Sequence, residues 1–126
     1  MLIFGIGSDI VEVSRIKKIF KNKNFKKKIF SKKEIKLINA RSNRIPGYAK
    51  KFAAKEAFSK ALGTGISGGI LFKEISVENN KKGAPCIVLS GKTKSIVQRT
   101  IKKRYKTFLT ISDEKKYAFA TVILTY

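Results

Sequence analysis

The segment that most constrains the fold is FAAKEAFSKALGTG, residues 52–65, where helix-forming residues run into a glycine-rich stop. At about 100° per residue, its apolar side chains gather on one arc, while Glu56 and Lys60 lie together on roughly the opposite arc. Gly63 directly follows the last apolar residue, so it is predicted to end the helix in the left-handed conformation. The apolar arc consists of Ala54, Ala57, Phe58, Ala61 and Leu62.

Two interpretations of Glu56 and Lys60 are open. A glutamate one turn before a lysine is the favoured orientation for a solvated ion pair, worth about 0.2–0.5 kcal/mol. Alternatively, the turn formed by Gly63, Thr64 and Gly65 lies close to Lys60, and its backbone N–H groups could approach an anion. The spacing alone favours the surface ion pair.

Length and composition narrow the classes of protein. A chain of 126 residues with 43% hydrophobic residues predicts one domain with one core. No apolar run is long enough to cross a membrane, and the first residues lack a secretory pattern, so we expect a cytoplasmic protein. Cys86, the single cysteine, is predicted to be a thiol in a buried strand. Without histidine, the usual zinc sites and the Ser-His-Asp and Cys-His systems are excluded, and any metal must be a hard ion bound by oxygen.

The formal net charge of +21 at pH 7 predicts attraction to anionic partners. Nucleic acid, a phosphorylated cofactor and an acidic protein are the three classes to consider. A small basic RNA-binding protein is therefore an alternative function. The chain has no aromatic RNP signature, no KH-type GXXG in its expected context and no zinc knuckle, so we expect no specific nucleic-acid binding.

The remaining pattern predicts alternating strands and helices. Strands are expected over 2–13, 71–79, 86–90, 106–113 and 117–126, and a glycine-rich loop over 63–69. Helices are expected after Ser14 as N-cap, after a capping box of Ser31 and Glu34, from Pro46, and over 92–105. The first strand contains two glycines where another backbone or a ligand can come close, and Asp9 lies within it or at its end.

Three segments in this order resemble one known family. GIGSDIVEVSRI (5–16), FAAKEAFSKALGTGI (52–66) and SDEKKYAFATVIL (112–124) together are closely similar to the holo-[acyl-carrier-protein] synthases, the small 4'-phosphopantetheinyl transferases. The resemblance implies one α+β domain over residues 1–126, with an antiparallel sheet packed with helices, and a homotrimer with active sites between neighbouring subunits. It also implies magnesium-dependent transfer of 4'-phosphopantetheine from coenzyme A to a serine of apo-acyl carrier protein, releasing adenosine 3',5'-bisphosphate, in support of fatty acid biosynthesis.

The resemblance also assigns residues to the site. Asp9 and Glu56 match the family's magnesium ligands, and Lys60 matches a lysine near the pyrophosphate of coenzyme A. The Gly63–Gly65 turn looks like part of the wall around the cofactor. Proton removal from the carrier serine falls either to Glu56 or to a water bound to the metal. Asp113 is expected either to orient the cofactor or the serine, or only to cap a turn.

The basic residues after the first strand match the family's docking surface for acyl carrier protein, an acidic partner. Arg15 aligns with a family arginine that meets carrier carboxylates. Lys18 and Lys21 are predicted to extend this surface on the basis of charge, and the run at 26–28 continues it.

Overall fold

The computed structural model describes residues 1–65 and 68–126. Within these residues, five strands form two antiparallel sheets, one with the order β1-β5-β4 and the other formed by the hairpin β2-β3. The strands are β1 (Ile3–Glu12), β2 (Ile75–Asn79), β3 (Pro85–Leu89), β4 (Lys106–Asp113) and β5 (Tyr117–Thr125). The helices are α1 (Val13–Ile19), α2 (Lys23–Ile29), α3 (Lys32–Asn39), α4 (Arg44–Leu62), the 3-10 helix η2 (Phe72–Glu74) and α5 (Gly91–Ile101). The predicted α+β fold with antiparallel sheets is confirmed.

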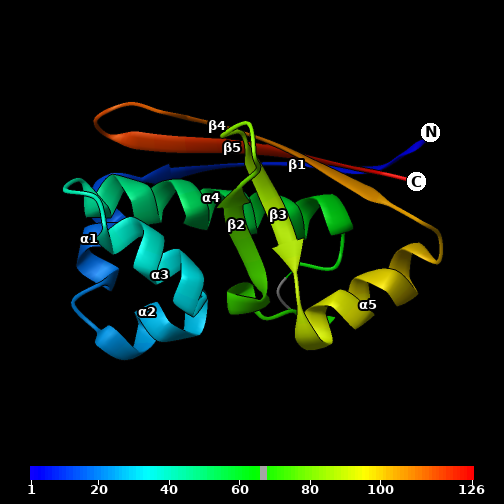
Figure 1. The fold of residues 1–126 in the computed structure, drawn as a ribbon, viewed down its shortest axis with the longest axis horizontal. Coiled ribbons are helices and arrows are strands. Elements are labelled where there is room, and N and C mark those ends of the chain that lie inside the picture. The colour runs from blue at the N-terminus through cyan, green and yellow to red at the C-terminus, as the bar shows by residue number, and fades with distance from the viewer. Residues whose placement is uncertain (66–67) are drawn as a thin grey trace.

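Helix α4 lies along one face of the three-stranded sheet (Figure 1). It packs mainly against β1 and β5, and the β2-β3 hairpin crosses its other side. Close packing of α4 on β1 depends on Gly5 and Gly7, because a Cβ atom at either position would overlap a backbone oxygen of α4, that of Ala61 or Ala57 respectively. The prediction that another backbone approaches these glycines is therefore confirmed. None of the described helices lies on the opposite face of the sheet (Figure 1).

The short helices α1, α2 and α3 pack together at one end of α4 (Figure 1). Phe20, Phe30 and Tyr48 form an edge-to-face cluster at their centre, with ring centroids 4.7–5.5 Å apart. The predicted capping box is present, because the Ser31 hydroxyl accepts from the Glu34 N–H and the Glu34 carboxylate accepts from the Ser31 N–H. Within the described part of the chain, no helix is long and apolar enough to cross a membrane.

Several predicted boundaries are wrong at the start of the chain. Glu12, not Ser14, is the N-cap of α1, and the Ser14 hydroxyl instead donates to the Glu12 carboxylate at 2.6 Å. Helix α2 was not predicted, because its seven residues are mostly lysine and carry no long apolar stripe. Asn22 caps it by accepting from the Asn24 N–H. Helix α4 begins at Arg44, two residues before Pro46, which still lies in the first turn where a missing N–H costs little.

In the second half of the chain, the differences between predicted and observed elements have local causes. The strand predicted over 71–79 is split into η2 and β2, and the helix predicted over 92–105 ends at Ile101, with Lys102 in the left-handed conformation at φ 61°. Cys86 is half-buried instead of buried, because β3 is the outer strand of a two-stranded sheet. The loop predicted over 63–69 includes residues 66–67, which lie outside the described residues.

Candidate active site

Asp9, Glu56 and Lys60 meet where β1 passes over the C-terminal half of α4. The Lys60 ammonium donates to the Asp9 carboxylate at 3.1 Å and to the backbone oxygen of Ser8 at 2.9 Å. The Glu56 carboxyl is half-buried and lies close enough to Asp9 for the two charges to repel. The structure therefore brings together the three residues that the sequence placed in two distant segments.

The electrostatics of Glu56 reflect this crowding. Burial raises the pKa of the Glu56 carboxyl above its ordinary value, and the neighbouring Asp9 carboxylate adds to the rise. Lys60 and Arg15 oppose the rise through their positive charges. A cation bound beside Asp9 and Glu56 would therefore stabilise the charged form of the Glu56 carboxyl.

The surface ion pair between Glu56 and Lys60 was the simpler prediction, and the structure does not contain it. Among the described residues, the ion pair of Lys60 is with Asp9. The reason is the close approach of β1, which the helical spacing of α4 alone could not indicate. Glu56 consequently faces β1 instead of bulk solvent.

The glycine-rich turn follows directly. Gly63 ends α4 in the left-handed conformation at φ 85°, as predicted, and its N–H bonds back to the carbonyls of Ser59 and Lys60. Gly65 also has a positive φ, of 59°. The Thr64 hydroxyl lies 3.4 Å from the Gly65 carbonyl oxygen. The turn begins seven residues after Glu56, about two helical turns along the chain, and three residues after Lys60.

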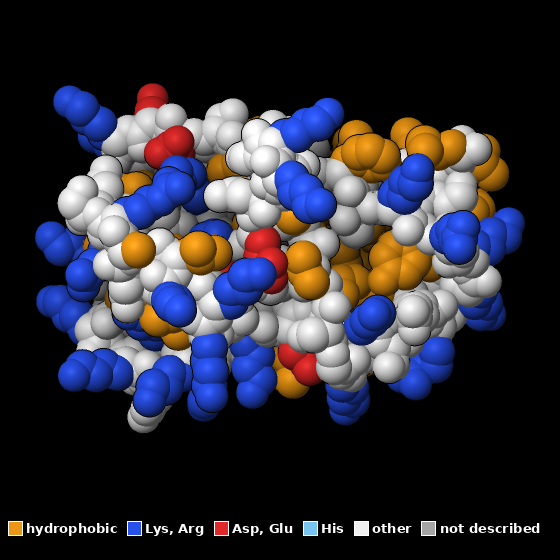
Figure 2. All heavy atoms as spheres, in the orientation of Figure 1, with side chains coloured by type: hydrophobic (Ala, Val, Ile, Leu, Met, Phe, Trp, Pro, Cys, Tyr) orange, Lys and Arg blue, Asp and Glu red, His pale blue; other side chains and the backbone are white. Residues whose placement is uncertain are grey.

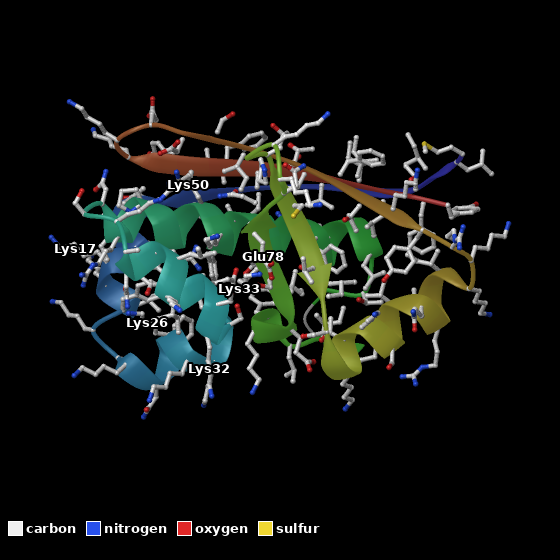
Figure 3. All side chains as sticks on the ribbon, in the orientation of Figure 1. Lys17, Lys26, Lys32, Lys33, Lys50 and Glu78 are labelled. Carbon is white, nitrogen blue, oxygen red and sulfur yellow. The ribbon has the colours of Figure 1, made fainter. Side chains whose placement is uncertain are left out.

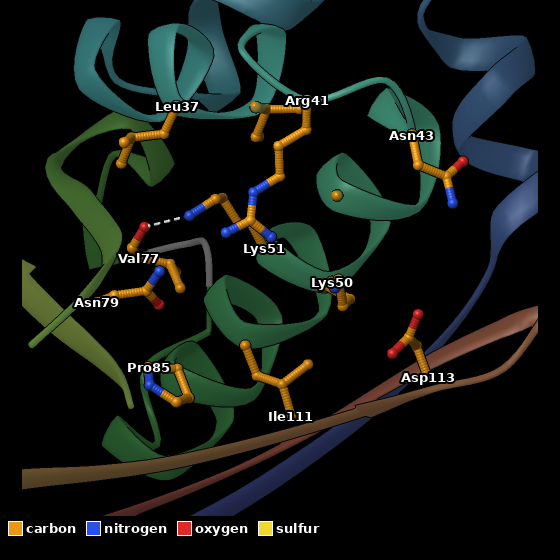
Figure 4. Close-up of a pocket in the computed structure, with 12 residues that line it drawn as sticks. Leu37, Arg41, Asn43, Lys50, Lys51, Val77, Asn79, Pro85, Ile111 and Asp113 are labelled. Atoms are coloured by element: carbon orange, nitrogen blue, oxygen red, sulfur yellow. Dashed lines mark hydrogen bonds between the residues drawn. The ribbon is translucent and has the colours of Figure 1, made fainter. Parts of the chain in front are cut away.

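Asp113 lies elsewhere, at the end of β4. Because β5 separates β4 from β1, Asp113 and Asp9 lie on different strands at opposite edges of the sheet. The Asp113 side chain is exposed and lines a pocket of about 270 Å³ between β4, α4 and the β2-β3 hairpin (Figure 4). The structure therefore does not bring Asp113 to the carboxylate pair within one chain.

The pocket is rich in cationic side chains. Arg41, Lys50 and Lys51 line it, together with apolar residues such as Ile111 (Figure 4). Lys51 donates to the backbone oxygen of Val77 at 2.5 Å, and burial lowers the pKa of its ammonium. Three cations facing one carboxylate make a pocket suited to an anionic ligand. Sequence analysis missed these three residues, because they lie on α4 and the preceding turn without a recognisable motif.

The predicted docking residues lie on and just after α1. Arg15 and Lys18 are exposed on α1, and Lys21 is exposed in the turn that follows. Arg15 also influences the charge of Glu56, so this surface adjoins the carboxylate pair. Lys17 and Lys32 project outward from α1 and α3 in Figure 3, whereas the Lys26 ammonium lies over the Tyr48 ring, and blue side chains cover much of this end of the molecule in Figure 2.

A buried ion pair was also missed. Lys55 and Glu34 are fully buried, and their side chains lie 2.7 Å apart. The Lys55 ammonium also donates to the backbone oxygens of Phe72 and Ile75, and the Glu34 carboxylate accepts from the Val77 N–H. The sequence contained a signal for it, because Lys55 is seven residues before Leu62 and so falls on the apolar arc of the helix.

The fold and its charged groups define a small α+β protein with a carboxylate pair beside a lysine and a separate cationic pocket. Residues 5–122 match the family model of the 4'-phosphopantetheinyl transferase superfamily. A holo-[acyl-carrier-protein] synthase of Pelagibacter ubique is 52% identical over 98% of both chains, and one of Fusobacterium nucleatum is 42% identical over 98% of this chain and 99% of the relative. This chain belongs to the 4'-phosphopantetheinyl transferase superfamily and, within it, to the holo-[acyl-carrier-protein] synthases.

Solved structures agree with this placement. The holo-[acyl-carrier-protein] synthase of Neisseria meningitidis superimposes with a TM-score of 0.88 at 32% identity, covering 99% of this chain and all of that one. The enzyme of Bacillus anthracis, solved in complex with CoA (3',5'-ADP), superimposes with a TM-score of 0.80 at 34% identity, covering 98% of this chain and 97% of that one.

Proposed function

We propose that this protein transfers the 4'-phosphopantetheine group of coenzyme A to a serine of apo-acyl carrier protein, releasing adenosine 3',5'-bisphosphate, in support of fatty acid biosynthesis. Residues 1–126 would act as one transferase domain, working in the cytoplasm. The observation that carries the proposal is the meeting of Asp9, Glu56 and Lys60 between β1 and α4 in a chain that is 52% identical to a synthase.

Asp9 and Glu56 would hold a magnesium ion. Among the described residues, no group of three or more acidic, histidine or cysteine side chains can hold a metal by itself. Two neighbouring carboxylates fit magnesium nonetheless, because this ion is usually bound by one or two carboxylates together with substrate phosphates and waters. When bound, the ion would neutralise charge on the pyrophosphate of coenzyme A.

Glu56 and Lys60 then have separate roles in the transfer. The serine oxygen bonds to the phosphorus that carries pantetheine, and the bond from this phosphorus to the bisphosphate oxygen breaks. Lys60 would offset the negative charge that grows on the leaving bisphosphate. Glu56 would accept the serine proton, because its carboxylate adjoins both Asp9 and the docking residue Arg15.

The cationic pocket would bind another anionic part of coenzyme A. Arg41, Lys50 and Lys51 supply three positive charges around a space of about 270 Å³, and Asp113 at its rim is available to orient the ligand through hydrogen bonds. The pocket and the carboxylate pair lie on opposite sides of α4, because Lys51 faces β2 and Glu56 faces β1. A ligand in the pocket therefore cannot run directly to the carboxylates of the same chain.

A neighbouring subunit would resolve this separation. The free face of the sheet carries two apolar rows, Ile10 beside Phe119 and Ile6 beside Ile123 and Phe108. Four of these side chains are 42–62% exposed, which is unusual for large hydrophobic residues gathered on one face. We propose that these faces meet in a homotrimer, which places one subunit's pocket beside the next subunit's carboxylate pair, as a head-to-tail ring does.

The acidic carrier protein would dock on the surface of Arg15, Lys18 and Lys21. Arg15 adjoins Glu56, so a carrier bound there would present its serine near the reacting groups. Charge complementarity of this kind mainly raises the association rate, which then falls steeply with added salt.

The test is a carrier-modification assay. Purified protein, magnesium, coenzyme A and folded apo-acyl carrier protein are mixed, and the mass of the carrier is followed. We expect the mass to increase by one phosphopantetheine group, and no increase with a carrier whose acceptor serine is replaced by alanine. An unmodified carrier in the presence of magnesium or manganese would contradict the proposed function.

A further inference from the structure

The Lys60 ammonium lies beside the Asp9 carboxylate, which in the proposed function binds the metal. It lies 3.1 Å from the Asp9 carboxylate oxygen and 2.9 Å from the Ser8 carbonyl oxygen. At this distance, Lys60 serves as the counter-ion of the Asp9 carboxylate. A divalent cation approaching Asp9 would meet the like charge of Lys60 within a few ångströms.

The two ends of the Lys60 side chain differ in freedom. Its Cβ atom is packed against β1, since a Cβ atom added at Gly7 would lie 2.9 Å from it. The side chain as a whole is 54% exposed, whereas Asp9 is only 17% exposed. The stem is therefore held by β1, while the flexible end with its ammonium can leave Asp9 for solvent or for another anion.

We propose that Lys60 is the resident counter-ion of Asp9 in the ligand-free enzyme and keeps free metal from binding until coenzyme A draws the lysine away. This rests on the proposed function, in which Asp9 and Glu56 hold magnesium and Lys60 meets the pyrophosphate. Coenzyme A provides the alternative anion, and its binding releases the Asp9 carboxylate. Binding of metal and of coenzyme A is then coupled, each favouring the other.

The structure identifies the charge on which this coupling depends. Glu56 cannot replace Lys60 as partner of Asp9, because both are acidic and repel each other. Arg15 opposes the charge of Glu56 but forms no ion pair with Asp9 in the described part of the chain. Removing the Lys60 charge should thus affect the two ligands in opposite directions, which neither a purely catalytic lysine nor a purely structural one would do.

The experiment measures binding of Mn²⁺ to the full-length protein by electron paramagnetic resonance, without coenzyme A. In Lys60→Met, an uncharged side chain of similar length, we expect Mn²⁺ to bind about fivefold tighter than in the wild type. Lys33→Met is the matched control, because it removes one charge from an exposed ion pair, Lys33 with Glu78, that lies outside the site (Figure 3). Thermal unfolding verifies that each variant is folded, and Lys60→Gln repeats the test if Lys60→Met is not.

Calorimetry with coenzyme A gives the second half of the test. Lys60→Met should bind coenzyme A more weakly than the wild type does, and the gain in Mn²⁺ affinity caused by coenzyme A should shrink. Mn²⁺ affinity in Lys60→Met that is no higher than in Lys33→Met overturns the proposal. Asp9→Asn separates the two ideas: if it retains full Mn²⁺ binding in the presence of coenzyme A, the assigned metal site is wrong and the inference falls with it. If Asp9→Asn loses Mn²⁺ while Lys60→Met gains nothing, only the counter-ion role fails.

Discussion

The Glu56 carboxyl lies where α4 packs against β1, and its charged form is unfavourable there in the absence of a ligand. Burial and the adjacent Asp9 both favour its neutral form, and two cations only partly compensate. Enzymes commonly hold functional groups in such environments, because the ligand or transition state supplies the missing partner. The role proposed for Glu56 would thus come at some expense of stability.

We expect Glu56→Gln to lose at least about 100-fold in transfer rate while becoming slightly more stable at neutral pH. The pKa of Glu56 is raised in the folded state, so the folded protein binds more protons than the unfolded one between the two pKa values. The carboxylate consequently lowers stability at pH 7, and this penalty disappears below the ordinary pKa of about 4.3.

Thermal unfolding of metal-free protein between pH 4 and pH 7.5 checks this. The midpoint of Glu56→Gln should exceed that of the wild type at pH 7 and converge with it near pH 4. Glu114→Gln, in the exposed turn between β4 and β5, controls for the change in net charge. A constant difference across the range would show that Glu56 is not the titrating group.

Lys55, next to Glu56 in the chain, has the opposite role. Its ammonium is fully buried and saturated by Glu34 and two backbone oxygens. Burial lowers its pKa to about 8, since loss of water outweighs the attraction of Glu34. The pair connects α4 to α3, η2 and β2 at once.

We predict that Lys55→Met lowers the free energy of unfolding by about 3–5 kcal/mol, because it leaves the Glu34 carboxylate buried without a counter-ion. The double variant Lys55→Met, Glu34→Gln should recover part of this loss, since a neutral amide needs no counter-ion and still accepts from the Val77 N–H. Urea unfolding of both variants gives the comparison. Equal losses in the two variants would mean that the packing of Lys55, not its charge, sets the stability.

At the scale of elements, sequence patterns predicted most of the helices and strands, and the failures have physical reasons. Strand β1, helix α4 with its Gly63 stop, and the β4 and β5 strands follow from strong periodicity and glycine placement. Helix α2 does not, because its stability comes from packing around Phe30 and not from its own lysine-rich sequence. The ion pair of Lys60 was misassigned for a similar reason: its partner is set by contact between β1 and α4, not by spacing within α4.

That contact makes Gly7 a sharp test of how α4 and β1 position the site. In Gly7→Ala, the new Cβ atom would overlap the Ala57 carbonyl oxygen and lie 2.6 Å from the Ala61 nitrogen, both of which are backbone atoms. Because the backbone cannot move aside as a side chain can, we expect a loss of about 3 kcal/mol or more in the free energy of unfolding. Transfer activity should also fall, since Asp9 moves relative to Lys60.

Gly83→Ala is the control for this prediction. Gly83 has a φ of 83°, but no other atom lies near its added Cβ, so the substitution should cost only about 1 kcal/mol of backbone strain. Urea unfolding and the carrier assay compare the two variants. Similar losses in both would show that the separation of β1 from α4 is not critical.

At the scale of the whole molecule, the sequence alone could not show how the two charged regions relate. The three motifs predicted the residues of the carboxylate pair, but the strand order β1-β5-β4 places Asp113 at the sheet edge opposite Asp9. The cationic pocket lies away from the pair because Lys51 faces β2, whereas Glu56 faces β1. Likewise, alternation along β5 predicts that one face is buried, yet only the sheet shows that Phe119 and Ile10 lie side by side on an uncovered face. Local patterns do not contain the strand order, and so they do not show which side chains share the uncovered face.

The uncovered face leads to the last prediction, that Phe119→Glu converts the proposed homotrimer into single chains without transfer activity. Phe119 is 42% exposed on the outer face of β5, and a carboxylate there would lose its water if a second sheet covered it. Leu71→Glu is the matched control, because Leu71 is 44% exposed but lies before η2, away from the sheet face. Sedimentation velocity and circular dichroism then separate loss of assembly from loss of fold. We expect folded single chains for Phe119→Glu and wild-type assembly with normal activity for Leu71→Glu. Wild-type protein that sediments as a single active chain would instead show that one subunit contains the complete site.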